Sequence, residues 1–144
     1  MPHANILVVE DNVTEQYALK QLLERFDFAV DTLSSGEEAL EVLANSKYAA
    51  ILMDVTLPGI NGYECTKEIR KLEKELGRRT PIIALTGRAM QKDRQDSIDA
   101  GMDDYLSKPF DSEDLRRMLL RYVYESGRPN LKVLSSLPEG NENV

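Results

Sequence analysis

The stretch AAILMD at residues 49–54 decides the fold, because five apolar residues run without a polar break into one acidic residue, Asp54. An apolar run of this length is typical of a strand that is buried on both faces of a parallel sheet. Similar β-prone runs occur on both sides of it along the chain. The predicted strands are residues 6–9, 28–33, 49–53, 81–85 and a short one at 105–106.

Helical patterns fill the intervals between these strands. Helices are expected at 13–26, at 34–44, after the turn at 58–62, at 90–100, and from a cap at Asp111 to residue 124. Five strand–helix units predict an α/β fold with a parallel sheet and helices on both faces. We expect apolar side chains to gather on one side of the first helix (Val13, Tyr17, Leu19, Leu22, Leu23, Phe26) and of the third (Cys65, Ile69, Leu72, Leu76).

Length and composition narrow the class of protein. The 144 residues suit one domain, and 42% hydrophobic with 30% charged residues is ordinary for a globular protein. A net charge of −7 argues against a nucleic-acid surface, which needs clustered cations. No apolar run approaches the roughly 20 residues that span a bilayer. The first residues, MPHANILVVE, lack the features of a signal peptide, so we expect a cytoplasmic protein.

Two residue types are nearly absent. Cys65 is the single cysteine, which excludes an internal disulfide and a cysteine-based zinc site. His3 is the single histidine and lies near the N-terminus, so a buried histidine-based catalytic or metal site is not available.

The last segment, residues 126–144, differs from the rest. It contains two prolines and two glycines and ends in polar residues, which favours a flexible tail. A short docking helix is the alternative, because Leu131, Leu134 and Leu137 recur at a spacing of three. We therefore divide the chain into a domain at 1–125 and a tail at 126–144.

Reactive side chains stand where the predicted strands end. Open parallel sheets bind ligands at the carboxyl ends of their strands, so residues placed there meet in one crevice. Each alone has an ordinary explanation, such as a helix cap or a solvated turn. Together, three carboxylates, a hydroxyl and an ammonium suit a divalent cation and a phosphoryl group. The set is Glu10, Asp11, Asp54, Thr86 and Lys108.

Four segments carry a resemblance to a known family. They are LVVEDN at 7–12, LMDVTLPGINGYE at 52–64, PIIALTG at 81–87 and DDYLSKPF at 103–110. In these motifs and their spacing, residues 4–125 resemble a response-regulator receiver domain, of the stand-alone chemotaxis type or the hybrid-kinase type. The resemblance implies a flavodoxin-like, doubly wound sheet of five parallel strands in the order 2-1-3-4-5 with five flanking helices.

The resemblance also implies roles for the strand-end residues. Asp54 would be the phosphoacceptor, and Lys108 would hold the phosphoryl oxygens. Mg²⁺, for which Mn²⁺ can substitute, would be bound by Asp11, Asp54 and the backbone carbonyl of Thr56, with Glu10 acting through water.

Further positions acquire roles in the same way. Thr86 and Tyr105 would form a switch that responds to the phosphoryl group. Thr56, Gly87 and Arg88 would tune the chemistry, with Gly87 leaving room at the mouth of the pocket. Lys108 and Pro109 would be joined by a cis peptide bond.

The resemblance implies partners as well. A sensor histidine kinase or a histidine phosphotransfer protein would supply the phosphoryl group. The surface made by the helix at 90–100, the strand at 105–106 and the last helix would then control a protein partner that the sequence does not identify. Self-phosphorylation and autodephosphorylation would be the only reactions, with no nucleic acid or membrane as partner, and the chain would be a monomer or a weak homodimer.

Three other functions compete with this one. A receiver-fold scaffold would work without phosphorylation. A haloacid-dehalogenase-like phosphatase needs a second Asp two residues after the nucleophile, where this chain has Thr56. A flavodoxin needs a phosphate-cradling first loop, and EDNVTE at 10–15 is acidic instead. The sequence also leaves open whether it is a stand-alone regulator or a fragment of a longer one, although Met1 just before the first strand suits a natural start.

Overall fold

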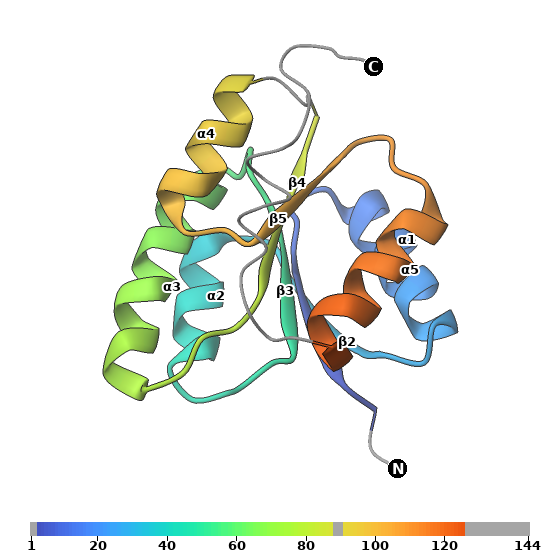
Figure 1. Cartoon of the computed structure of the whole chain (residues 1–144), viewed down its shortest axis with the longest axis horizontal. Helices are drawn as coiled ribbons and strands as arrows, with labels where there is room; N and C mark the ends of the chain where they lie inside the picture. Colours follow the sequence, from blue (N-terminus) through green and yellow to red (C-terminus); the bar gives the residue numbers. More distant parts are fainter. Residues whose placement is uncertain (1–2, 88–90, 126–144) are drawn as a thin grey trace.

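A single sheet of five parallel strands forms the centre of the molecule (Figure 1). The structure is a computed structural model that describes residues 3–87 and 91–125. The strand order is β2-β1-β3-β4-β5, which confirms the order expected from the sequence. The strands are β1 Asn5–Val9, β2 Ala29–Leu33, β3 Ala50–Asp54, β4 Ile82–Thr86 and β5 Asp104–Ser107.

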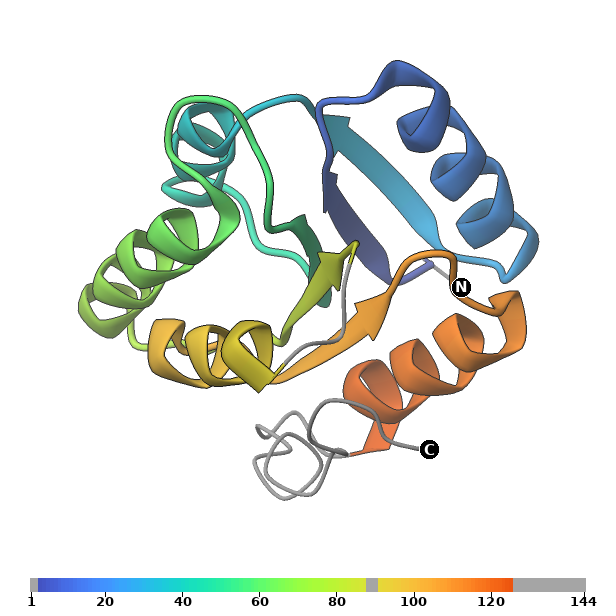
Figure 2. The ribbon, with the colours of Figure 1, turned by 90° about the horizontal axis from the view of Figure 1, so that it is seen from above.

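Helices cover both faces of this sheet, as Figures 1 and 2 show. α1 and α5 lie on one face, and α2, α3 and α4 lie on the other. The parallel sheet with helices on both faces, which the alternating pattern predicted, is therefore confirmed, and so is the doubly wound, flavodoxin-like arrangement that the family resemblance implied. The helices are α1 Val13–Arg25, α2 Gly36–Leu43, α3 Gly62–Leu76, α4 Gln91–Ala100 and α5 Ser112–Leu120, and α5 runs on into a π-helical turn at Arg121–Glu125.

The apolar core is split in two by the sheet. Side chains alternate along each strand, so Ile6 and Val8 face the α1–α5 layer while Leu7 and Val9 face the α2–α3 layer. All four are fully buried. Because both faces are covered, β3 and β4 are apolar at every position before their last residue, which is why AAILM stood out in the sequence.

Polar caps set where the helices begin. Asn12, Ser35, Asn61 and Asp111 each accept a backbone N–H from the first turn of the helix that follows. Such caps satisfy donors that have no partner within the helix. α3 ends at Gly77, whose φ of 71° is left-handed.

The expected clustering in α1 is wrong at its first turns. Val13 and Tyr17 are 74% and 65% exposed, whereas Leu19 and Leu23 are buried. At about 100° per residue, Val13 and Tyr17 point away from the side that carries Leu19 and Leu23. In α3, Leu76 is likewise 44% exposed, since it is the last residue of the helix.

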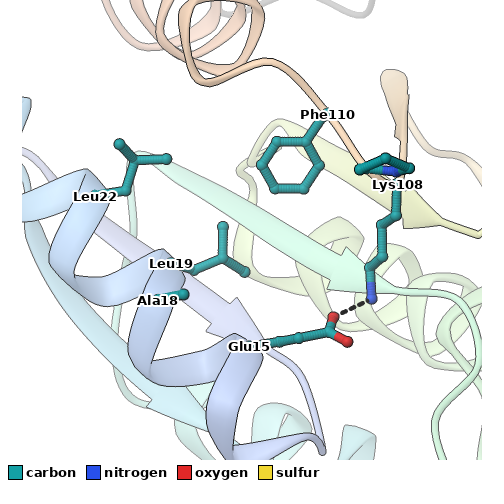
Figure 3. A pocket seen from close by; sticks show the side chains of 7 residues that line it. Glu15, Ala18, Leu19, Leu22, Lys108 and Phe110 are labelled. Atoms are coloured by element: carbon teal, nitrogen blue, oxygen red, sulfur yellow. Dashed lines mark hydrogen bonds and ion pairs between the residues drawn. The ribbon is translucent and has the colours of Figure 1, made fainter.

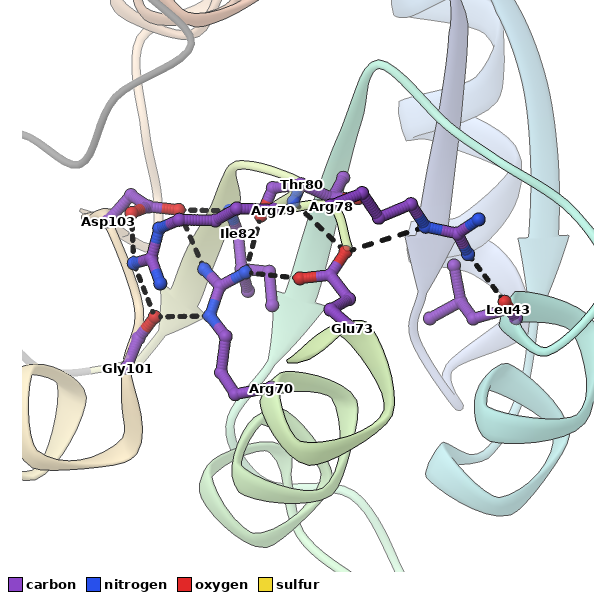
Figure 4. A network of polar contacts seen from close by, with 9 residues as sticks. All are labelled: Leu43, Arg70, Glu73, Arg78, Arg79, Thr80, Ile82, Gly101 and Asp103. Atoms are coloured by element: carbon purple, nitrogen blue, oxygen red, sulfur yellow. Dashed lines mark hydrogen bonds and ion pairs between the residues drawn. The ribbon is translucent and has the colours of Figure 1, made fainter. Parts of the chain in front are cut away.

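A buried polar network joins three elements at the end of the sheet opposite the predicted site (Figure 4). Arg70 of α3 donates to Glu73 at 2.7 Å and to Asp103 at 2.9 Å, and also to the carbonyl oxygens of Thr80 and Gly101. The Glu73 and Asp103 side chains are 2% and 1% exposed. Each buried carboxylate thus has a cationic partner, which burial of charge requires.

The same network extends to the first residues of β4. Arg79 forms a second ion pair with Asp103 at 2.8 Å. The backbone N–H of Ile82 donates a hydrogen bond to the Asp103 carboxylate, also at 2.8 Å. The network was not predicted from the sequence, because Asp103 lies 33 residues from Arg70 along the chain.

Candidate functional site

The strand ends bring the predicted residues to one edge of the sheet. Glu10 directly follows β1, Asp54 ends β3, Thr86 ends β4 and Lys108 directly follows β5. These four strands are neighbours in the sheet, and Asp54 pairs in register with Leu85, one residue before Thr86. The Lys108 backbone N–H donates to the Thr86 carbonyl oxygen at 2.7 Å, which holds the two strand ends together.

Three carboxylates form a candidate cation site there. Carboxylate oxygens of Glu10, Asp11 and Asp54 all lie within 4.8 Å of one another. Glu10 and Asp54 are 1% and 3% exposed, whereas Asp11 is exposed to solvent. Clustered oxygen donors open to water on one side suit a hard divalent cation, which keeps part of its hydration shell.

Lys108 provides the positive charge of the site. Its Nζ lies 2.7 Å from Glu15 Oε1, 3.0 Å from Glu10 Oε1 and 3.5 Å from Asp54 Oδ2. Burial lowers the pKa of Lys108, but these carboxylates outweigh burial, and the net pKa is raised. The ammonium therefore stays charged and offsets part of the acidic cluster.

The two buried carboxyls are shifted in opposite directions. Burial, aided by the hydrogen bond and repulsion from Asp54, raises the pKa of Glu10 to about 7. Burial also acts to raise the pKa of Asp54, but the Thr56 N–H and Lys108 outweigh it, and the pKa is lowered. Because two negative charges repel each other at this distance, Glu10 is the carboxyl that is protonated more easily, and Asp54 stays anionic. An anionic carboxylate is what a nucleophile requires.

Thr56 and Gly62 fix the orientation of Asp54. The Thr56 backbone N–H and hydroxyl both donate to Asp54 Oδ1, at 2.9 and 3.0 Å. The other carboxylate oxygen, Oδ2, faces Lys108. A Cβ at residue 62 would lie 2.3 Å from the Asp54 carbonyl oxygen, so only glycine lets α3 start this close to β3. The sequence identified residue 62 only as part of a turn.

The remaining predicted residues are placed as follows. Thr86 is buried at 3% exposure, and Tyr105 is half-buried against the core on the α2–α3 side of the sheet. A Cβ on Gly87 would meet nothing within 4 Å, so the structure shows no steric need for glycine there. The peptide bond between Lys108 and Pro109 is cis. Arg88 and the tail at 126–144 lie outside the described residues.

Two residues at the site were missed by sequence reasoning. Glu15 pairs with Lys108, and Gln16 Nε2 donates to the carbonyl oxygens of Glu10 at 2.6 Å and Leu33 at 3.2 Å. Gln16 thereby ties the acidic loop to the end of β2. Both residues lie in the first two turns of α1, directly after the acidic pair, and that position is the one signal that points to them.

An apolar cavity of about 440 Å³ opens beside the site (Figure 3). It lies between α1 and the chain that follows β5, with the Lys108–Glu15 ion pair at one end. The lining residues are Glu15, Ala18, Leu19, Leu22, Lys108, Pro109 and Phe110.

The family of the chain is established by comparison with known proteins. The family model for the response regulator receiver domain matches residues 6–120, and the chain belongs to this family. It is a receiver domain of two-component signalling, as the motifs indicated, and not a flavodoxin or a haloacid-dehalogenase-like phosphatase.

Individual relatives agree with this assignment. Hybrid signal transduction histidine kinase I of Dictyostelium discoideum is 35% identical over 84% of this chain. The receiver domain of sensor histidine kinase PA1611 from Pseudomonas aeruginosa PAO1, solved with a magnesium ion coordinated in its active-site cleft, is 43% identical. That match has a TM-score of 0.77 and covers 84% of this chain and 98% of that one.

A third match comes from a complex. The co-crystal structure of the Saccharomyces cerevisiae histidine phosphotransfer protein Ypd1 and the receiver domain of its response regulator Ssk1 contains a chain that is 32% identical. The TM-score is 0.79, with 85% of this chain and 90% of that chain covered.

Two further findings concern the length of the relatives and the presence of membrane-spanning helices. The chain spans only a fraction of the length of the first curated relatives it matches, 8% in the Dictyostelium kinase. Among the described residues, no helix has the length and apolar character needed to cross a membrane.

Proposed function

We propose that this receiver accepts a phosphoryl group on Asp54 from a phosphorylated histidine of a sensor kinase or a histidine phosphotransfer protein. The observation that carries the proposal is the setting of Asp54. Its buried carboxylate belongs to a cluster of oxygens that could hold a metal ion, it faces the Lys108 ammonium, and Thr56 fixes its orientation. These are the needs of phosphoryl transfer, which depends mainly on alignment and charge neutralisation.

Transfer of the phosphoryl group from the donor histidine to Asp54 needs no further reactant. An Asp54 carboxylate oxygen attacks the phosphorus atom, and an O–P bond forms. The N–P bond to the donor histidine breaks, and its electron pair returns to the imidazole nitrogen. Lys108 neutralises the negative charge on the equatorial oxygens, and Thr86 hydrogen-bonds the group after it arrives.

Mg²⁺ would be held by the acidic cluster. Asp11, Asp54 and the Thr56 carbonyl would bind it directly, and Glu10 would act through water. The donors are all oxygens, which fits Mg²⁺ and also Mn²⁺, and a magnesium ion occupies the cleft of the Pseudomonas receiver. When bound, the ion would supply positive charge that offsets the charge of the carboxylates and of the phosphoryl group.

A protein donor fits the surface beside the site. Val13 and Tyr17 are exposed on α1, and the apolar cavity opens next to Lys108. Exposed apolar area of this kind marks protein contacts. The yeast receiver solved with a histidine phosphotransfer protein supports the same class of partner. Thr86 and Tyr105 would transmit phosphorylation to the α4–β5–α5 surface, which would bind a downstream protein. Residues 1–125 would be the functional unit.

Intact-mass measurement tests the proposal. The wild-type chain is incubated with a small-molecule phosphodonor with and without Mg²⁺, beside Asp54→Asn and the control Asp114→Asn, an exposed carboxylate of α5. We expect one phosphate adduct on wild type and on Asp114→Asn, dependent on Mg²⁺, and none on Asp54→Asn. An adduct on Asp54→Asn would place the acceptor elsewhere. No adduct on wild type would favour the phosphorylation-independent scaffold.

A further inference from the structure

The pattern Asn-x-x-Glu stands at the start of both α1 and α3, but its Glu side chain makes different contacts in the two helices. In α3, the Asn61 side chain accepts the Glu64 N–H, and the Glu64 carboxylate accepts the Asn61 N–H in return. In α1, Asn12 accepts the Glu15 N–H, but the Asn12 N–H donates to Glu10 Oε2 instead. The carboxylate of Glu15 is thus released from the reciprocal cap that its sequence predicts.

Glu15 uses its free carboxylate to hold Lys108. The distance from Lys108 Nζ to Glu15 Oε1 is 2.7 Å, shorter than the 3.0 Å to Glu10 and the 3.5 Å to Asp54. Figure 3 shows the pair closing one end of the apolar cavity, with the Lys108 side chain reaching toward α1. The ammonium that should serve the phosphoryl group is therefore drawn toward α1 and away from Asp54.

We propose that Glu15 is a positioning residue that restrains Lys108 in the resting domain, so that phosphorylation requires Lys108 to exchange Glu15 for phosphoryl oxygens. This inference rests on the proposed function of Asp54. Glu15 opposes the active state by competing for the same ammonium, and it thereby sets how tightly the site holds a phosphoryl group.

Burial explains why Lys108 would leave Glu15 and keep its contact with Glu10. The Glu10 side chain is 1% exposed, so losing Lys108 would leave a buried carboxylate without its cation. The Glu15 side chain is 46% exposed, and water can replace Lys108 there. Its position in the first turn of α1 also favours a negative charge. A half-exposed ion pair contributes little, so we expect an effect of about two- to fivefold on binding.

The test is the affinity of the metal-loaded chain for beryllofluoride, a phosphoryl mimic, measured by calorimetry at saturating Mg²⁺. Glu15→Gln removes the charge. Glu15→Asp keeps the charge but shortens the side chain by one methylene, which breaks the contact with Lys108. The control is Glu113→Gln, a first-turn carboxylate of α5 that pairs with Arg116. We expect both Glu15 variants to bind the mimic about two- to fivefold more tightly than wild type, and the control to match wild type.

Each other result has a definite meaning. Unchanged affinity in both Glu15 variants overturns the inference, and weaker binding does the same. If Glu15→Asp binds beryllofluoride as wild type does while Glu15→Gln binds it more tightly, then the negative charge at position 15 weakens binding without a contact to Lys108. The inference is wrong in that case too. Wild type that binds no beryllofluoride and takes no phosphate would instead refute the proposed function. Thermal unfolding of each variant verifies that the fold is intact.

Discussion

At the scale of single residues, the site shifts the pKa values of two neighbouring carboxyls in opposite directions, so that Glu10 is protonated more easily than Asp54. Burial and the closeness of Asp54 raise the pKa of Glu10 to about 7, while Thr56 and Lys108 lower that of Asp54. Asp54 therefore stays ionised, which the proposed phosphoacceptor role requires.

The pKa of Glu10 predicts how stability depends on pH in the absence of metal. Because the folded pKa is above the usual 4.5, the unfolded chain releases this proton first. The free energy of unfolding therefore falls as pH rises from about 4.5 to about 7. The shift corresponds to roughly 3 kcal/mol at most, at about 1.4 kcal/mol per pKa unit. Glu10→Gln should remove this loss, so that it exceeds wild type in stability at pH 7.5 and matches it near pH 4.5.

Urea denaturation with a chelator present measures both stabilities. Glu41→Gln, which removes an exposed carboxylate of α2, is the control and should follow the wild-type pH curve. Parallel curves for Glu10→Gln and wild type would show that Glu10 does not hold a proton in the folded state.

Some residues of the site could be predicted from their position along the sequence alone. Glu10, Asp54 and Lys108 were found because strand ends of a parallel sheet meet. Glu15 was missed because Asn-x-x-Glu predicts a cap, and only the three-dimensional structure shows that Lys108, which follows β5, contacts it. Gly62 was missed as a contact because its closeness to Asp54 is a three-dimensional fact.

At the scale of elements, the helices are held to the sheet by different means. α1 and α5 pack through apolar side chains, whereas the end of α3 is joined to β4 and β5 by the network around Arg70 (Figure 4). The apolar period predicted that Cys65 and Ile69 of α3 face inward, and both are fully buried. It failed for the first turns of α1, where Val13 and Tyr17 are exposed.

Removing Arg70 should destabilise the fold. Arg70→Met leaves Glu73 and Asp103 with fewer cationic partners in a buried setting, which costs about 3 kcal/mol. Lys71→Met is a matched control, because Lys71 is 74% exposed and its pair with Glu68 contributes little. Urea denaturation should show a large loss for the first variant and a change within about 0.5 kcal/mol for the second. Equal, small losses would mean that the network adds no net stability.

At the scale of the whole molecule, the proposed switch requires the site to alter the surface made by α4, β5 and α5. Thr86 ends β4 and Tyr105 lies in the neighbouring β5, so a movement of Thr86 has a short path to α4 and α5. A few kcal/mol of differential binding are enough to shift such an equilibrium.

Two-dimensional NMR with Mg²⁺ and beryllofluoride tests this switch. We expect shifts in the site and also along the chain from Thr86 to Tyr105. In Thr86→Val, which keeps the shape but loses the hydroxyl, the shifts near Asp54 should persist and those near Tyr105 should vanish. If wild-type shifts stay within the residues that contact Asp54, or the Tyr105 shifts survive in the variant, the switch does not run through Thr86.

The proposal that Asp54 carries the phosphoryl group is tested by locating the modified residue. Borohydride reduces an aspartyl phosphate to homoserine, and peptide mass spectrometry then identifies the position. After incubation with Mg²⁺ and a phosphodonor, we predict homoserine at position 54 alone. Homoserine at position 11 or at another aspartate, or an unmodified Asp54 in a chain that carries phosphate, would contradict the account.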